Sequence, residues 1–204
     1  MEIEAKLLLP TEQALQEAPA HLEALGMSCQ ALEHREVVDG YYDSRAWDLF
    51  QAGFALRKRW VNGRWRATLK SLGKAKDGIA KREELEADLP EGADFPPISG
   101  ALAERIQDLV GKLEFVEQLR LTQNRRVLQV KGHDLELEAS LDHAQVEGGG
   151  RQADLFELEL ELLKGPEQVL AKISDQLRAR TGWPASQSSK FEWACSQIGL
   201  NPKA

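Results

Sequence analysis

The first residues of the chain combine two carboxylates and an amine at alternating positions. In the sequence of residues 2–7, apolar side chains separate Glu2, Glu4 and Lys6. Strand side chains alternate between two faces, so this segment would have one ionised face and one apolar face. Carboxylates beside an ammonium group suit a divalent metal ion next to an anionic substrate. The alternative is an edge strand with a solvated charged face, which is usual in antiparallel sheets.

A second charged face belongs to a predicted β-hairpin around Asn62-Gly63. An Asn-Gly pair between two strand-like runs indicates a type I′ turn, because both central residues of that turn need positive φ. The two-residue loop sets the register and places Arg59 opposite Arg66. These like charges repel each other unless anions neutralise them or solvent screens them. The whole face would carry Arg57, Arg59, Arg64, Arg66, Thr68 and Lys70.

Three later segments repeat the alternation of acidic and aliphatic residues. They cover residues 84–88, 134–142 and 157–161, and each is predicted to be a strand with one ionised face. Further strands are predicted at 33–43 and within 115–130. The chain would therefore contain acidic strands and basic strands of the same design.

Amphipathic helices are predicted at 11–25, 101–113 and 166–180, and Pro19 is expected to kink or split the first of them. A sheet whose apolar face is covered by these helices has its charged face on the other side. Closure into a barrel would turn that face inward and remove the edge strands. We therefore expect an α+β fold, a closed antiparallel β-barrel with a charged interior and helices packed on the outside.

The bulk composition limits the class of protein. The 204 residues suit one domain, 1–204, and the net charge of −7 argues against a general nucleic-acid binder. Cys29 and Cys195 lack the spacing of a disulfide framework or a zinc site. No signal-peptide pattern and no apolar run of about 20 residues is present. We expect a cytoplasmic protein that binds neither nucleic acid nor membranes; the sequence does not indicate its oligomeric state.

Short motifs occur in a fixed order along nearly the whole chain. They are Glu2-Ile3-Glu4-Ala5-Lys6 (ExExK), Tyr42-Asp43-Ser44, Leu56-Arg57-Lys58-Arg59 (LRxR), Thr68-Leu69-Lys70 (TxK), Arg82-Glu83-Glu84, Glu138 with Asp142 (ExxxD), residues 157–162 (ELELEL) and Ser189-Lys190. Taken in order, these motifs resemble the CYTH domain, also called the triphosphate tunnel metalloenzyme family, and the resemblance extends to the bacterial inorganic triphosphatases. Tyr42 and Ser44 stand where Phe and Thr are commoner in that family.

The resemblance implies an eight-stranded antiparallel tunnel that binds triphosphate groups and metal ions, Mg²⁺ or Mn²⁺, in a two-metal site. It implies catalytic roles for Glu4 and Lys6. The implied metal ligands are Glu2, Glu4, Glu157 and Glu159, with Glu84, Glu138 and Asp142 as further candidates. The implied triphosphate ligands are Lys6, Arg57, Arg59, Lys70, Arg82, Arg125 and Lys190.

The expected function is metal-dependent hydrolysis of inorganic triphosphate to pyrophosphate and phosphate by direct attack of water. Two alternatives share the fold: a thiamine triphosphatase and a class IV adenylate cyclase. A third alternative, a non-catalytic polyphosphate or nucleotide sensor, would use the same tunnel for binding alone. The many acidic candidates argue against the sensor, because binding an anion does not by itself require so many carboxylates.

Overall fold

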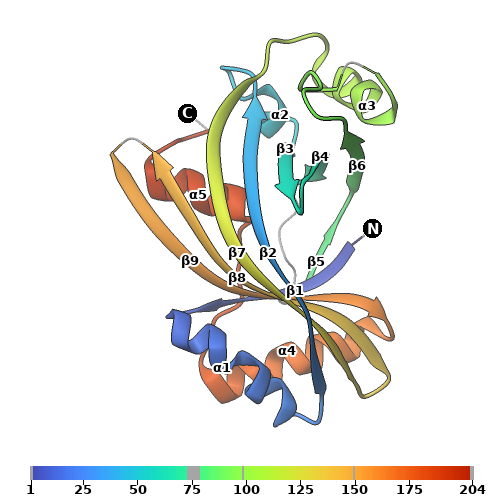
Figure 1. Cartoon of the computed structure of the whole chain (residues 1–204), viewed down its shortest axis with the longest axis vertical. Helices are drawn as coiled ribbons and strands as arrows, with labels where there is room; N and C mark the ends of the chain where they lie inside the picture. The colour runs from blue at the N-terminus through green and yellow to red at the C-terminus, as the bar shows by residue number, and fades with distance from the viewer. Residues whose placement is uncertain (1, 73–78, 98, 149, 203–204) are drawn as a thin grey trace.

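The computed structural model describes residues 2–72, 79–97, 99–148 and 150–202, and it has an α+β fold (Figure 1). The strands are β1 (Glu2–Leu9), β2 (Ser28–Asp43), β3 (Phe54–Val61), β4 (Arg64–Ser71), β5 (Ile79–Arg82), β6 (Glu84–Leu89), β7 (Val116–Gly132), β8 (Leu135–Gly148) and β9 (Arg151–Lys164). The helices are α1 (Glu12–Glu23), α2 (Asp48–Gln51), α3 (Ala101–Val110), α4 (Glu167–Thr181) and α5 (Lys190–Ile198).

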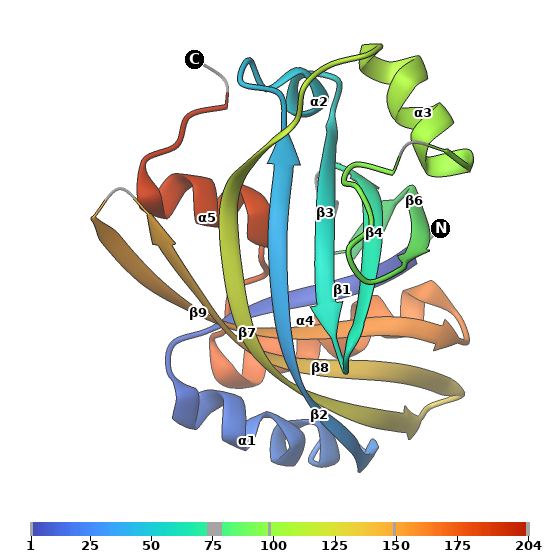
Figure 2. The same cartoon turned by 45° about the horizontal axis from the view of Figure 1, so that its top comes forward.

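All strands belong to one antiparallel sheet in the order β5-β1-β9-β8-β7-β2-β3-β4-β6. The long strands bend, so the sheet curves around an interior (Figure 2). Its edge strands β5 and β6 are consecutive in the chain and are separated by Glu83 alone. The antiparallel sheet is as expected. The expected closed barrel of eight strands is not confirmed, because this sheet has nine strands and two edges rather than a hydrogen-bonded ring.

The register of the predicted hairpin is confirmed. Arg59 lies opposite Arg66, and Arg57 lies opposite Thr68. Asn62 and Gly63 have φ values of 51° and 75°, as a type I′ turn requires. The arginines that we assigned to one face therefore do share a face of the sheet.

The outer, apolar face of the sheet is covered by helices. Side chains of α1 and α4 pack with those of β1, β7, β8 and β9 in the largest core cluster, and the two helices lie side by side beneath the sheet (Figure 1). Thr11 caps α1 by accepting a hydrogen bond from the backbone of Ala14. Pro19 does not split this helix, which is continuous from residue 12 to residue 23. A second outer cluster joins β3, β4 and β6 to α2 and α3.

Helix α5 is an exception to the expectation that helices pack on the outside. Its residues Phe191 and Cys195 pack against Tyr41, Leu121 and Val146. Leu121 is paired with Asp39, and Asp39 is paired with Arg59, so this contact is with the inner face of the sheet, the face that carries the hairpin arginines. The apolar stripe of α5 therefore fills one end of the interior. No helix in the part of the chain that is described is long and apolar enough to cross a membrane.

Candidate functional site

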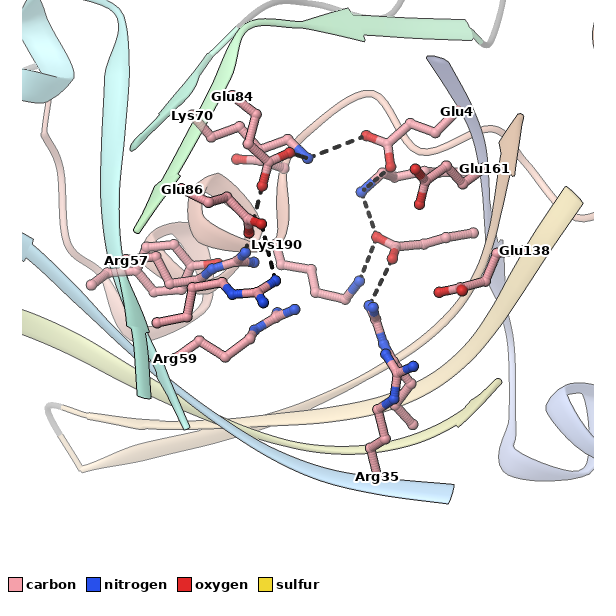
Figure 3. A pocket seen from close by; sticks show the side chains of 16 residues that line it. Glu4, Arg35, Arg57, Arg59, Lys70, Glu84, Glu86, Glu138, Glu161 and Lys190 are labelled. Carbon is pink, nitrogen blue, oxygen red and sulfur yellow. Dashed lines mark hydrogen bonds and ion pairs between the residues drawn. The ribbon is translucent and has the colours of Figure 1, made fainter. Parts of the chain in front are cut away.

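The inner face of the sheet surrounds a charged cavity of about 520 Å³. Eight cationic and six acidic side chains line it, together with Tyr41 and Ser189. They come from eight strands and from the start of α5, and they converge on one space (Figure 3). The cationic residues are Lys6, Arg35, Arg57, Arg59, Arg66, Lys70, Arg125 and Lys190, and the acidic residues are Glu4, Glu84, Glu86, Glu138, Glu159 and Glu161.

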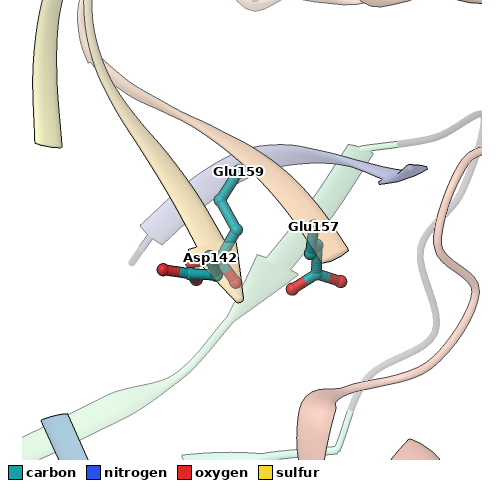
Figure 4. Close-up of side chains that lie close together, drawn as sticks. All are labelled: Asp142, Glu157 and Glu159. Carbon is teal, nitrogen blue, oxygen red and sulfur yellow. The ribbon is translucent and has the colours of Figure 1, made fainter. Parts of the chain in front are cut away.

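Lys190 lies at the centre of a tight acidic cluster, which we call the lysine cluster. Its Nζ atom is 2.8 Å from Oδ2 of Asp142 and 2.6 Å from an Oε atom of both Glu157 and Glu159. The three carboxylates lie close enough together to hold a metal ion (Figure 4). In this structure the ammonium group of Lys190 already supplies the cation that such a cluster needs.

The charges of the lysine cluster stabilise one another. Burial by itself would lower the pKa of Lys190, but its carboxylate neighbours outweigh burial and raise that pKa well above its usual value. Burial opposes ionisation of Asp142 and Glu159, yet the nearby cations lower the pKa of both carboxyl groups. Burial dominates at Glu157 and raises its pKa. Lys190, Asp142 and Glu159 are therefore held in their charged forms.

Arg125 extends this network into the cavity. Its guanidinium group donates two hydrogen bonds to Asp142, at 2.7 and 2.6 Å, and a third to Glu159 at 2.7 Å. Such paired bonds orient the plane of the guanidinium group. On β1, Lys6 forms ion pairs with Glu159 and with Glu4, the latter at 3.3 Å. Glu159 thus joins three cations from three different elements.

The wall formed by β3, β4 and β6 contains a separate group of cations. Arg59 donates from Nε and Nη2 to the two oxygens of Asp39, both at 2.7 Å. The Nη2 atom of Arg57 lies 3.8 Å from the carboxylate of Glu84, and the Nζ atom of Lys70 lies 3.2 Å from the same carboxylate. Burial alone would raise the pKa of Asp39, but Arg59 and Arg57 lower it to about 2.

Three glutamates form a row across neighbouring strands on the opposite side. Glu4 lies directly opposite Glu161, and Glu161 lies directly opposite Glu138. All three line the cavity and face Arg57 and Arg59 across it (Figure 3). Like charges in directly opposed positions destabilise a sheet. A divalent cation bound between such carboxylates would remove that repulsion, and oxygen ligands are what Mg²⁺ and Mn²⁺ prefer.

A capping box positions the start of α5. The Ser189 hydroxyl accepts a hydrogen bond from the backbone N–H of Glu192 at 3.2 Å, and the Glu192 carboxylate accepts one from the backbone of Ser189 at 3.0 Å. Lys190 is the first residue after this cap. Reciprocal bonds of this kind define where a helix begins. The cap therefore determines where the Lys190 side chain enters the cavity.

The structure brings together most of the residues that we expected at the site. Asp142 and Glu157 do not line the cavity but are buried in the lysine cluster. The side chains of Glu2 and Arg82 lie outside the described part of the structure, although their backbones are paired. The expected residues that line the cavity are Glu4, Lys6, Arg57, Arg59, Lys70, Glu84, Arg125, Glu138, Glu159 and Lys190.

Several cavity residues were not among the sequence-based candidates. Glu161 continues the alternation of Glu157 and Glu159, so the pattern alone could have included it. Arg66 was assigned to the correct face but not to the site. Arg35, Tyr41, Glu86 and Ser189 also line the cavity, and Asp39 lies directly behind its wall. Arg35 and Asp39 share one face of β2 with Val37, and nothing in the sequence indicates their partners.

Comparisons with known proteins agree with this geometry. The model of the CYTH domain family matches residues 1–191. A protein from Hippeastrum, described as an adenylyl cyclase candidate with a dominant triphosphatase activity, has a similar fold with a TM-score of 0.69 and 23% identity, over 100% of this chain and 99% of that one. A protein from Bacillus halodurans described as an adenylate cyclase candidate has a TM-score of 0.67 and 18% identity, over 95% and 96%.

A protein from Pyrococcus horikoshii shares the fold at a TM-score of 0.56 and 19% identity, over 96% of this chain and 99% of that one. At these identities the three structures are evidence about the fold alone. The match to the family model covers almost the whole length, and it includes the strands and the helix start that surround the cavity. The chain therefore belongs to the CYTH domain family.

Proposed function

We propose that this chain hydrolyses inorganic triphosphate to pyrophosphate and phosphate, with Mg²⁺ or Mn²⁺ as cofactor. The observation that carries this proposal is the division of the cavity into a row of carboxylates and a facing set of arginines. Arginine binds phosphate oxygens with paired hydrogen bonds, and carboxylates bind divalent cations. A triphosphate together with its metal ions matches both walls at once.

The acidic row fits a metal ion better than the lysine cluster does. Glu4, Glu138 and Glu161 offer oxygen ligands at the cavity wall, and Lys6 lies at one end of this row, 3.3 Å from Glu4. The Lys190 ammonium group, in contrast, is within 2.8 Å of all three carboxylates of the lysine cluster. We assign metal binding to the acidic row and keep Glu2, Glu84 and Glu159 as candidates from the sequence. Of these, Glu159 also contacts Lys6, Arg125 and Lys190. Bound metal ions would offset phosphate charge and lower the pKa of a water molecule.

The cationic residues would orient the triphosphate and stabilise the charge that develops as the bond to the leaving pyrophosphate breaks. Arg57, Arg59 and Lys70 reach the cavity from one wall, and Lys6 and Arg125 reach it from the other. In phosphoryl transfer most of the catalysis comes from such positioning and electrostatic stabilisation. Hydrogen bonds to buried carboxylates hold several of these cations in place before the substrate binds. In this proposal water attacks directly.

The lining favours an inorganic substrate over one with an organic group. None of the five tryptophans belongs to the described cavity wall, and its aromatic residue Tyr41 is already stacked on Phe191 with ring centroids 4.9 Å apart. A base or a thiazolium ring would have little aromatic surface to stack on. Thiamine triphosphatase and adenylate cyclase activities are the alternatives.

We also propose that the β5–β6 segment completes the wall of a tunnel. Strand β5 pairs with β1, strand β6 pairs with β4, and Glu83 alone separates them. One continuous segment therefore links the two sides of the sheet. Such a wall would exclude bulk water around the bound anion and strengthen the electrostatic interactions.

The test is release of phosphate from triphosphate, ATP and thiamine triphosphate, with Mg²⁺, Mn²⁺ or a chelator present. We expect triphosphate to be the best substrate, with no turnover in the chelator and a large loss in Glu4→Gln. Glu114→Gln changes an exposed carboxylate outside the cavity and serves as the control. Equal rates in Glu4→Gln and the wild type would contradict the role of Glu4. Binding of triphosphate without turnover under either metal would favour the sensor.

A further inference from the structure

Asp39 is a wholly buried carboxylate on β2, behind the cationic wall of the cavity. Asp39 accepts two hydrogen bonds from Arg59, as Asp142 of the lysine cluster does from Arg125. We propose that Asp39 is a positioning residue that holds the guanidinium groups of Arg59 and Arg57 in the orientation that stabilises the transition state at a bound phosphate. The proposal rests on the proposed function, because it assigns these arginines to a phosphate.

The contact between Asp39 and Arg59 restricts the arginine strongly. The two residues are directly opposed on β2 and β3, and two parallel bonds of 2.7 Å join the carboxylate to Nε and Nη2. This arrangement uses one edge of the guanidinium fork and leaves the other edge for a second anion. Gln123 holds the carboxylate from β7 by donating a hydrogen bond of 2.5 Å to Oδ2.

Arg57 is restrained less tightly by the same carboxylate. Its Nε lies 3.9 Å from Oδ1 of Asp39 and, although buried, has no hydrogen-bond partner in the described structure. Its Nη2 donates to the hydroxyl of Thr68 at 3.2 Å. One carboxylate thus orients Arg59 through two hydrogen bonds and attracts Arg57 by charge alone. Replacing Asp39 should therefore affect Arg59 more than Arg57.

Asp39 also offsets repulsion within the wall. Arg59 lies between the positive charges of Arg57, two residues away on the same strand, and Arg66, directly opposite on β4. Without a counter-ion these side chains would turn away from one another, and the wall would have to reorganise when the substrate binds. A preformed arrangement avoids that cost in the transition state.

Asp39→Asn tests the role of the carboxylate, because asparagine has nearly the same shape but carries no negative charge. Its amide NH₂ group would face donors of Arg59 or Gln123 instead of accepting from them. The cavity would become more positive, so ground-state attraction for triphosphate should not weaken. We expect kcat to fall by roughly tenfold to a hundredfold, the scale of small misplacements, while KM stays level or falls. Arg59→Gln, which removes a cation, should instead raise KM.

A double-mutant cycle tests whether Asp39 acts through Arg59. Arg59→Lys keeps the positive charge but cannot donate the two parallel hydrogen bonds that a guanidinium group makes to a carboxylate. In that background, Asp39→Asn should lower kcat by less than threefold, in contrast to its effect in the wild type. Asp154→Asn, which removes a carboxylate paired with His143 on the outer face, is the matched control and should leave kcat unchanged. Equal effects of Asp39→Asn in both backgrounds would overturn the proposal.

Binding measurements keep this test separate from that of the proposed function. Calorimetric titration with inorganic triphosphate reports on the arginine wall even if no substrate is turned over. We expect Asp39→Asn to bind triphosphate as tightly as the wild type or more tightly, but only when Arg59 is present. If the wild type binds triphosphate without hydrolysing it, the proposed function fails. The double-mutant cycle is then evaluated from the triphosphate affinities of the four proteins instead of from kcat. If Asp39→Asn lowers affinity as much as Arg59→Gln does, the positioning role is wrong.

Discussion

Glu4 on β1 and Glu161 on β9 lie directly opposite each other at the wall of the cavity. Glu138 on β8 continues the row on the other side of Glu161. Opposed carboxylates are unfavourable in a sheet, so this arrangement costs stability unless cations are near. The fold thus maintains, beside a cationic wall, a set of oxygen ligands that a divalent ion would stabilise.

Glu161→Gln should weaken metal binding and activity together. The change removes one negative ligand from the acidic row, and we expect the metal concentration for half-maximal activity to rise by roughly tenfold or more, as for other changes around metal sites. The increase in thermal stability on adding Mg²⁺ should also be smaller than in the wild type, because the ion has lost one ligand. Activity measured against Mg²⁺ concentration and thermal unfolding with and without Mg²⁺ check the two effects. Glu147→Gln, at an exposed position of β8, is the control.

Lys190→Gln should destabilise the protein in a pH-dependent manner. Three buried carboxylates would remain without their central cation, and breaking a buried ion pair typically costs about 3–5 kcal/mol. The folded-state pKa values of these carboxyl groups should rise, so the destabilisation should be largest at neutral pH and smaller near pH 5, where they bind protons. Thermal unfolding at both pH values measures this. An equal loss of stability at the two pH values would contradict this prediction. So would the same loss in the control Lys172→Gln, which lies on the exposed side of α4.

The wild type should lose stability as the pH falls below about 4. The pKa of Asp39 is about 2 in the folded protein and below the value of 3.8 for an unperturbed aspartate. The unfolded chain therefore binds the proton first, and the stabilisation, about 2 kcal/mol for this group, is present above pH 4 and is lost as the pH falls towards 2. Asp142 and Glu159, whose pKa values are also lowered, add to this slope. Unfolding measured between pH 7 and 2 should be less steep in Asp39→Asn.

Ser189→Ala should reduce both stability and turnover. Loss of the capping bond to Glu192 costs about 1 kcal/mol in typical helices. Because Lys190 directly follows the cap, fraying of the first turn would also displace its ammonium group from the lysine cluster. Ser196→Ala removes an exposed serine hydroxyl later in the same helix and should have little effect on kcat. A Ser189→Ala variant with wild-type kcat would show that the cap does not position Lys190.

Much of the framework follows from local sequence patterns. Strict alternation identified the faces of β1 and β9, and Asn62-Gly63 determined the hairpin register, because a two-residue turn permits one pairing. Helical periodicity identified α1, α3 and α4, although Pro19 does not interrupt α1. The order of the motifs indicated the CYTH family, which the family match confirms.

Other features depend on which segments meet in space. Helix α5 has an apolar stripe like the other helices, and only packing determines that it covers the inner face. Alternation places Glu157, Glu159 and Glu161 on one side of β9 but does not distinguish them. The position of Lys190 separates them, because its ammonium group contacts Glu157 and Glu159. Nothing in the sequence indicates the contacts of Asp39 either, because its partners lie on two other strands.

The sequence by itself therefore determined which faces are charged, how the hairpin pairs and which family the motifs resemble. These properties depend on side-chain alternation and turn geometry, which act between near neighbours in the chain. The tertiary structure alone decided which carboxylates line the cavity and which contact the buried ammonium group of Lys190; Glu159 does both. That choice depends on the distances between charges on separate strands and on α5, because the interaction energy of two charges changes strongly over a few ångströms.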